Sequence, residues 1–359
     1  MTSIEPRPLV GIIANPVSAR DIRRVIANAT SLQITDRANI VLRVLASLRA
    51  CGVERVVMMP ENGGIRGHVH RGLQRAANRG EATFPGLEYL DMPVTGTVGD
   101  TRRAARMMRD VGVRALIVLG GDGTHRAVVA ACRELPIAGI STGTNNAFPE
   151  HREPTVTGLA VGLAVTGRIP PAVAFAPNKL LEVEVGGSHH DVALVDVAIV
   201  AERYVGARAL WRTESFRELF VTFADPEVIG MSAIAGLLAP RGAREPGGVH
   251  VALAPLERAP LCIHAPIAPG MIRAVGVEHY AEMPADRPFG LSTPAGSIAL
   301  DGEREIAFDD GREVSITLRE NAFRTVDVSA CMRHAARHGS LVGADALRGS
   351  TDSITKEEE

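Results

Sequence analysis

Residues 115–124, which read Ala-Leu-Ile-Val-Leu-Gly-Gly-Asp-Gly-Thr, decide the fold of this chain. The apolar run 115–119 predicts a buried strand, and residues 124–132 carry a helical pattern directly after the glycines. A strand, a glycine loop and a helix in this order bind anions, because the glycine backbone approaches a phosphate closely and the helix N-terminus offers unpaired N–H groups. The alternative is an Asp-Gly turn between two antiparallel strands, which the helical pattern disfavours.

Asp122 lies in the middle of this loop, where its carboxylate would repel a phosphate. We therefore expect Asp122 to have a separate task, either accepting a proton from an attacking hydroxyl or holding Mg²⁺. His125 falls in the first turn of the predicted helix, where it either contacts a phosphate or is exposed to solvent.

A second polar loop follows the next predicted strand, 137–140, and reads Ser-Thr-Gly-Thr-Asn-Asn-Ala-Phe-Pro over residues 141–149. Loops at the carboxyl ends of neighbouring parallel strands line one crevice, where open α/β sheets bind ligands. Asn145 and Asn146 carry amides suited to ribose, phosphate or base edges. An asparagine-rich turn without a ligand is the alternative, and it stays open.

The chain divides into two halves of different pattern. Up to residue 168, short apolar runs alternate with helical stretches, which predicts an α/β domain whose parallel sheet is covered by helices on both faces. Residues 169–328 show alternating runs joined by glycine turns, which predicts mostly antiparallel β structure, interrupted by one helix at 214–223. We expect a C-terminal helix over 329–349 and a disordered tail over 350–359.

Composition excludes several classes of protein. The 359 residues carry a formal net charge of −2, which argues against a nucleic-acid partner. Lys179 and Lys356 are the only lysines, and neither follows a Walker A glycine pattern. The four cysteines lack metal-ligand or disulfide spacing, and no apolar segment is long enough to enter a membrane. We expect a soluble, cytoplasmic protein that forms a homo-oligomer and works on small molecules.

The two loops together resemble a known superfamily. Gly-Gly-Asp-Gly-Thr followed by Gly-Thr-Asn-Asn is similar to ATP-NAD kinases, diacylglycerol kinases and sphingosine kinases, and most resembles the ATP-NAD kinase-like proteins of the acetoin catabolism protein X type. The resemblance implies an N-terminal α/β domain, a C-terminal β-sandwich and an active site between them. It also implies that Asp122 acts at the substrate hydroxyl. The residues that it implies for phosphate and nucleotide binding are Asn15, Ser18, Gly120, Gly121, Gly123, Thr124, Thr142, Gly143, Thr144, Asn145 and Asn146.

Further matches fall in the second half. Residues 293–299, Thr-Pro-Ala-Gly-Ser-Ile-Ala, resemble a substrate loop of NAD kinases and nominate Thr293 and Ser297, although they stand later in the chain than in that family. Asp301-Gly302-Glu303 resembles the Asp-Gly-Glu of lipid kinases, which implies that Asp301 binds substrate and that Glu303 supports catalysis. The same three residues also fit a two-residue hairpin turn, and both interpretations stay open.

One departure from the family concerns the substrate. NAD kinases carry an Asn-Glu pair that contacts the dinucleotide, whereas this chain has Val195 and Asp196. A valine cannot form the hydrogen bonds of an amide, so Asp196 alone is nominated as a substrate contact.

The sequence favours an ATP-dependent phosphotransferase that uses Mg²⁺ and acts on a hydroxyl of NAD or a related small metabolite. The alternatives are a non-catalytic nucleotide or dinucleotide sensor and a lipid kinase of the diacylglycerol type.

Overall fold

The computed structural model describes residues 7–16, 32–80, 84–142, 146–148, 152–187, 189–202 and 214–341. Five of its strands form a parallel sheet in the order β3-β2-β1-β4-β5. Their bounds are β1 Leu9–Ala14, β2 Arg55–Met58, β3 Gly86–Tyr89, β4 Ala115–Gly120 and β5 Ile137–Ser141. Every residue of β4 is buried, as a central parallel strand requires.

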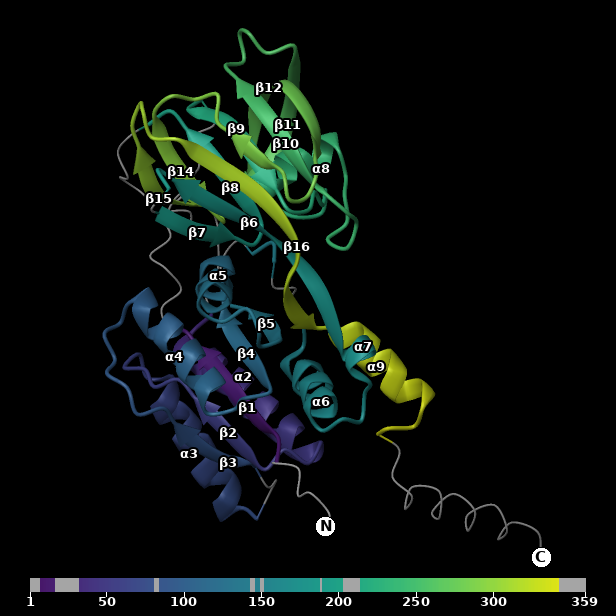
Figure 1. Cartoon of the computed structure of the whole chain (residues 1–359). Coiled ribbons are helices and arrows are strands. Elements are labelled where there is room, and N and C mark those ends of the chain that lie inside the picture. Colours follow the sequence, from purple (N-terminus) through teal and green to yellow (C-terminus); the bar gives the residue numbers. More distant parts are fainter. Residues whose placement is uncertain are drawn as a thin grey trace, which may run out of the picture.

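Helices cover both faces of this sheet, as the sequence predicted (Figure 1). One face packs against α2 Ile34–Ala50, α3 Ile65–Asn78, α6 Pro154–Val165 and α9 Val328–Arg337. The other packs against α4 Val98–Asp110 and α5 Asp122–Ala131. Because side chains alternate along a strand, the neighbouring residues Ile12 and Ile13 of β1 enter opposite cores.

The second half is a β-sandwich. An antiparallel sheet has the order β11-β12-β10-β9-β8-β14-β15. Its strands are β8 Asp196–Val200, β9 Phe216–Val221, β10 Gly248–Ala254, β11 Leu261–Ala268, β12 Met271–Met283, β14 Gly296–Leu300 and β15 Glu303–Phe308. It packs against β6 Phe175–Val185, β7 His189–Ala193, β13 Pro288–Gly290 and β16 Val314–Val326, with Leu181, Phe220 and Ile316 in the shared core. The short helix α8, Ser232–Leu238, contributes to the apolar core beside β10 and β11.

The paired strands β6 and β16 connect the two halves (Figure 1). They continue the parallel sheet, because Thr325 of β16 pairs with Ile137 of β5. The register between them shifts between Arg319 and Phe323, and Asn321 has a positive φ of 52° there. The short helix α7, Pro171–Ala174, precedes β6, and α9 follows β16.

Two predictions about elements are corrected. Residues 214–223 contain strand β9 rather than a helix, because β8 and β10 pair with it on both sides and override its helix-like aromatic spacing. The C-terminal helix ends at Arg337, followed by Gly339 at a positive φ of 62°, which suits a helix stop. The remainder of the helix predicted over 329–349, from residue 342 onward, and the predicted tail lie outside the described residues. Among the described helices, none is long and apolar enough to cross a membrane.

Candidate functional site

The predicted strand, glycine loop and helix are present at the end of β4. Gly121 is the N-cap of α5 and Asp122 is its first residue. A Cβ on Gly120 would stand 2.4 Å from the Cβ of Thr124, so only glycine allows this close turn. A Cβ on Gly123 would meet nothing within 4 Å, so the backbone there faces open space. The loop therefore has the form of an anion site at the N-terminus of a helix.

Three loops meet at this edge of the sheet. The Asn15 backbone N–H donates to the Leu119 carbonyl at 3.1 Å, and its side-chain amide donates to the Thr124 hydroxyl at 3.3 Å. The Thr142 N–H donates to the Gly120 carbonyl at 3.1 Å, and the Asn146 amide donates to the Ser141 hydroxyl at 2.7 Å. The structure thus brings Asn15, Thr124 and Thr142 together, whereas Ser18 and residues 143–145 lie outside the described residues.

Arg37 fastens these loops and was missed by the sequence reasoning. Its guanidinium donates to the Asn15 carbonyl and, at 3.3 Å, to the Thr142 carbonyl, and the residue is only 2% exposed. The signal was present in the sequence, since Arg37 stands one helical turn before the buried Val41 on the apolar stripe of α2. An arginine on such a stripe needs polar partners in the fold.

Asp122 lies between the second polar loop and the second half of the protein. Its carboxylate accepts the Ala147 N–H at 3.0 Å and the Phe148 N–H at 3.1 Å, which holds residues 147 and 148 against the first turn of α5. It also lines a cavity of about 20 Å³ together with Asp196 and Asp301. The acid predicted as the base therefore faces carboxylates contributed by the other half.

Asp301 and Glu303 belong to a hairpin turn between β14 and β15. Asp301 and Gly302 have φ values of 50° and 79°, as a tight two-residue turn requires. The Asp301 carboxylate accepts backbone N–H bonds from residues 194–196, and burial raises its pKa although Arg126 and these bonds lower it. Asp301 forms the turn and also lines the small cavity, and its role as a substrate contact stays a prediction. Glu303 pairs with Leu300 and does not line any cavity described for residues 7–341.

Arg126 bridges the helix of Asp122 to the second half and was also missed. Its guanidinium lies 3.7 Å from an Asp301 oxygen and 3.6 Å from an Asp191 oxygen. It follows Asp122 by four residues, one turn along α5. The neighbouring His125 is fully buried rather than exposed, its Nδ1 lies 2.9 Å from the Gly121 carbonyl oxygen, and burial lowers its pKa to about 4.

A larger cavity opens beside this site. It has a volume of about 470 Å³ and is lined by Ala147, Phe148, Lys179, Leu194 and Arg244, among others. Ala147 also lines the small cavity of Asp122, so the two adjoin. The volume is within the range of small-molecule sites, which favours a ligand between the halves.

The comparisons match both halves. The ATP-NAD kinase N-terminal domain matches residues 10–167, and the acetoin catabolism protein X C-terminal domain matches residues 179–321. Acetoin catabolism protein X of Cupriavidus necator is 56% identical over 340 residues, which cover 94% of each chain. The chain belongs to the acetoin catabolism protein X family.

Solved structures with lower similarity include a yeast NADH kinase complexed with NADH, which is 14% identical with a TM-score of 0.48 and covers 90% of this chain and 84% of its own. A diacylglycerol kinase from Bacillus anthracis is 10% identical with a TM-score of 0.45 and covers 89% of this chain and 96% of its own.

Ser297 lies at the opposite end of β14 from the cavity that Asp122 lines, and the role of Thr293 stays a prediction. Ser297 is fully buried, pairs with Val200 and donates its hydroxyl to the Glu202 carbonyl at 2.8 Å. Ser297 is the second residue of β14, and Asp301, which lines the cavity, directly follows the last residue of that strand. Because a strand rises about 3.3 Å per residue, the four residues from Ser297 to Asp301 span roughly 13 Å. A short motif cannot reveal this, because the direction of the strand decides which end reaches the cleft.

No group of three or more His, Cys, Asp and Glu side chains within the described ranges is arranged to hold a metal ion. Mg²⁺ does not need such a cage, because it is usually bound through one or two carboxylates, water and substrate phosphates. Asp122 and Asp196 line one cavity, and their carboxylates are the kind of ligand that this mode of Mg²⁺ binding requires.

Proposed function

We propose that this protein is an ATP-dependent phosphotransferase that acts on a hydroxyl of NAD or a related small metabolite, in the acetoin catabolism that names its relative. The observation that carries the proposal is the position of Asp122, at the first residue of α5 and in a cavity shared with Asp196 and Asp301. Asp122 also accepts hydrogen bonds from Ala147 and Phe148, which line the neighbouring cavity of about 470 Å³, so its carboxylate lies between the glycine loop and that larger cavity and is arranged for proton transfer.

The phosphates of ATP would lie against Gly121, Gly123 and Thr124 at the N-terminus of α5, where the backbone of Gly123 faces open space. Asn15 and Thr142, fixed by Arg37, would define the other wall. Asp122 would accept the proton of the acceptor hydroxyl as that oxygen attacks the γ-phosphate. Mg²⁺, when bound with the nucleotide, would supply charge neutralisation, and Asp196 is the carboxylate in the same cavity that would hold it. Positioning and electrostatics would supply most of the acceleration.

The acceptor would enter the cavity of about 470 Å³. Val195, which replaces the amide that NAD kinases use, is buried in the apolar core, and its N–H donates to Asp301 at 2.8 Å. Its side chain is therefore not available to a dinucleotide, which favours a smaller metabolite over NAD. A cytoplasmic location and a homo-oligomer stay predictions.

The test is transfer of labelled phosphate from ATP with Mg²⁺ to a panel that includes NAD, NADH, acetoin-related metabolites and diacylglycerol. Asp122→Asn should lower the rate by about 10²–10⁴-fold while nucleotide binding is largely kept, because the amide cannot accept the proton. Asp310→Asn, which changes an exposed carboxylate in the turn between β15 and β16, is the matched control and should retain most of the activity.

A non-catalytic nucleotide sensor is the second candidate. It is favoured by the bonds of Asp122, whose two oxygens each accept a backbone N–H and so serve to order the loop. A sensor predicts ligand-induced thermal stabilisation without phosphate transfer to any acceptor. Transfer that Asp122→Asn abolishes would exclude it.

A further inference from the structure

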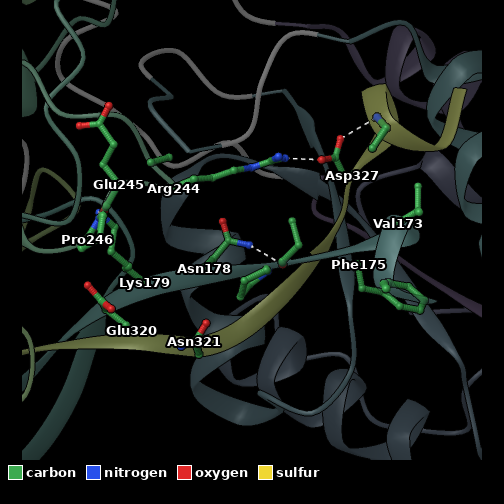
Figure 2. Close-up of a pocket in the computed structure, with 15 residues that line it drawn as sticks. Val173, Phe175, Asn178, Lys179, Arg244, Glu245, Pro246, Glu320, Asn321 and Asp327 are labelled. Carbon is green, nitrogen blue, oxygen red and sulfur yellow. Dashed lines mark hydrogen bonds and ion pairs between the residues drawn. The ribbon is translucent and has the colours of Figure 1, made fainter. Parts of the chain in front are cut away.

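Two cavities adjoin where β6 and β16 link the halves of the protein. Their volumes are about 430 and 470 Å³, and they share walls contributed by β6, β16 and the loop of residues 243–245. Figure 2 shows the smaller one, which is lined by Val173, Phe175, Lys179, Glu320 and Asp327, among others. We call it the hinge cavity. Its described walls lie outside the phosphate loop of Asp122, and they combine apolar side chains with a few polar ones, as small-molecule sites do.

Lys179 lines both cavities and reaches from β6 across to the loop that precedes β10 (Figure 2). Its amine donates to the Glu245 carbonyl and to the Gly247 carbonyl, both at 2.7 Å. These two bonds match the two hydrogens of a neutral primary amine, which retains a lone pair on nitrogen. Lys179 is thus held in a cavity wall by contacts that its uncharged form can also make.

The surroundings of Lys179 favour the uncharged form of its amine. Burial lowers the pKa of Lys179 to about 8, Arg241 lowers it as well, and Glu320 and Glu245 oppose the shift. Arg244 and Asp327, which also line the hinge cavity, form an ion pair with each other. At neutral pH roughly a tenth of the amine is uncharged, compared with less than about a thousandth for an ordinary lysine.

We propose that Lys179 captures a small carbonyl compound, an aldehyde or ketone, as a reversible imine in the hinge cavity. The lone pair on Nζ attacks the carbonyl carbon and forms a C–N bond. The carbonyl oxygen then leaves as water while the C=N bond forms, taking both hydrogens of the amine, and water reverses the reaction. No oxidant or reductant is needed. Val173 and Phe175 form an apolar wall for the carbon chain of the ligand.

This inference is independent of phosphate transfer and is tested without it. The competing explanation is a permanently charged lysine that only fastens the Glu245–Gly247 loop. The two differ in one chemical property, because only an uncharged amine that faces the cavity forms an imine.

The chain offers a sharp experiment because it has two lysines. Lys356→Arg leaves Lys179 as the only lysine, and Lys179→Arg is the matched control with the positive charge kept. Each full-length protein is incubated with propionaldehyde and sodium cyanoborohydride, which fixes an imine as an alkylated amine, and peptides are analysed by mass spectrometry over a pH series.

We expect Lys179 to be alkylated roughly a hundredfold faster than Lys356 at neutral pH, with a rate that saturates with propionaldehyde and a pH midpoint near 8. A linear dependence on aldehyde concentration would overturn capture in a cavity. Labelling of Lys179 only after unfolding in urea would establish the structural role instead. Because the native chain is itself labelled, the test does not depend on whether a Lys179 variant folds.

Discussion

Replacing Arg126 with methionine should leave a negative charge stranded inside the protein. Asp301 has no exposed side-chain surface, and Arg126 stands 3.7 Å from it and 3.6 Å from Asp191. Each pair is worth about 4–5 kcal/mol of gross attraction at an effective dielectric constant of about 20. Removing one partner of a buried pair costs about 3–5 kcal/mol. Asp301 keeps its backbone N–H bonds, so we expect the lower end, about 3 kcal/mol at neutral pH.

The destabilisation by Arg126→Met should depend on pH, in a direction that follows from the pKa of Asp301. Burial raises the folded-state pKa of Asp301 and Arg126 lowers it, so Arg126→Met raises the pKa further. A carboxyl whose pKa is higher in the folded than in the unfolded state takes up its proton on folding, which favours the folded state at acid pH. The destabilisation by Arg126→Met should therefore shrink as pH falls from neutral toward about 5.

The assay is urea unfolding of the wild type, Arg126→Met, Asp301→Asn and the double variant at both pH values. The two changes should be coupled, because Asp301→Asn removes the charge that Arg126 compensates. Arg126→Lys keeps a cation and should lose less stability. A loss below about 0.5 kcal/mol, or one equal at both pH values, would refute the reasoning.

Four further substitutions test the glycine loop and the link between the halves. Gly120→Ala should destabilise the protein by about 1–3 kcal/mol, because its Cβ would meet Thr124 at 2.4 Å. Gly123→Ala, whose Cβ would meet nothing within 4 Å, should keep the stability of the protein but weaken nucleotide binding measured by calorimetry. Arg37→Ala should lower the melting temperature and the nucleotide affinity together, and an unchanged affinity would contradict its role at the loops. Asn321→Gly should raise stability by up to about 1 kcal/mol in thermal unfolding, since its φ of 52° suits glycine, and a loss would refute that argument.

Much of the first half could be predicted because its signals are local. The apolar run of β4, the glycines after it and the helical pattern of α5 are adjacent in sequence, and each favours its own element. The family resemblance rests on these residues, on the second polar loop about twenty residues further along the chain, and on weaker matches in the second half. The second half gave a weaker signal, and its aromatic spacing at Phe216 and Phe220 suggested a helix where pairing with two neighbouring strands makes β9.

The sequence by itself determined the α/β and antiparallel classes of the two halves and the strand, glycine loop and helix that carry the candidate base Asp122. Only the tertiary structure decided that Asp301 turns inward to Arg126, that Ser297 lies at the other end of its strand, and that Lys179 lines a cavity. The physical reason is distance along the chain. Propensity and hydrophobic period act between near neighbours, whereas burial and ion pairs join residues such as Arg126 and Asp301, which stand far apart in sequence.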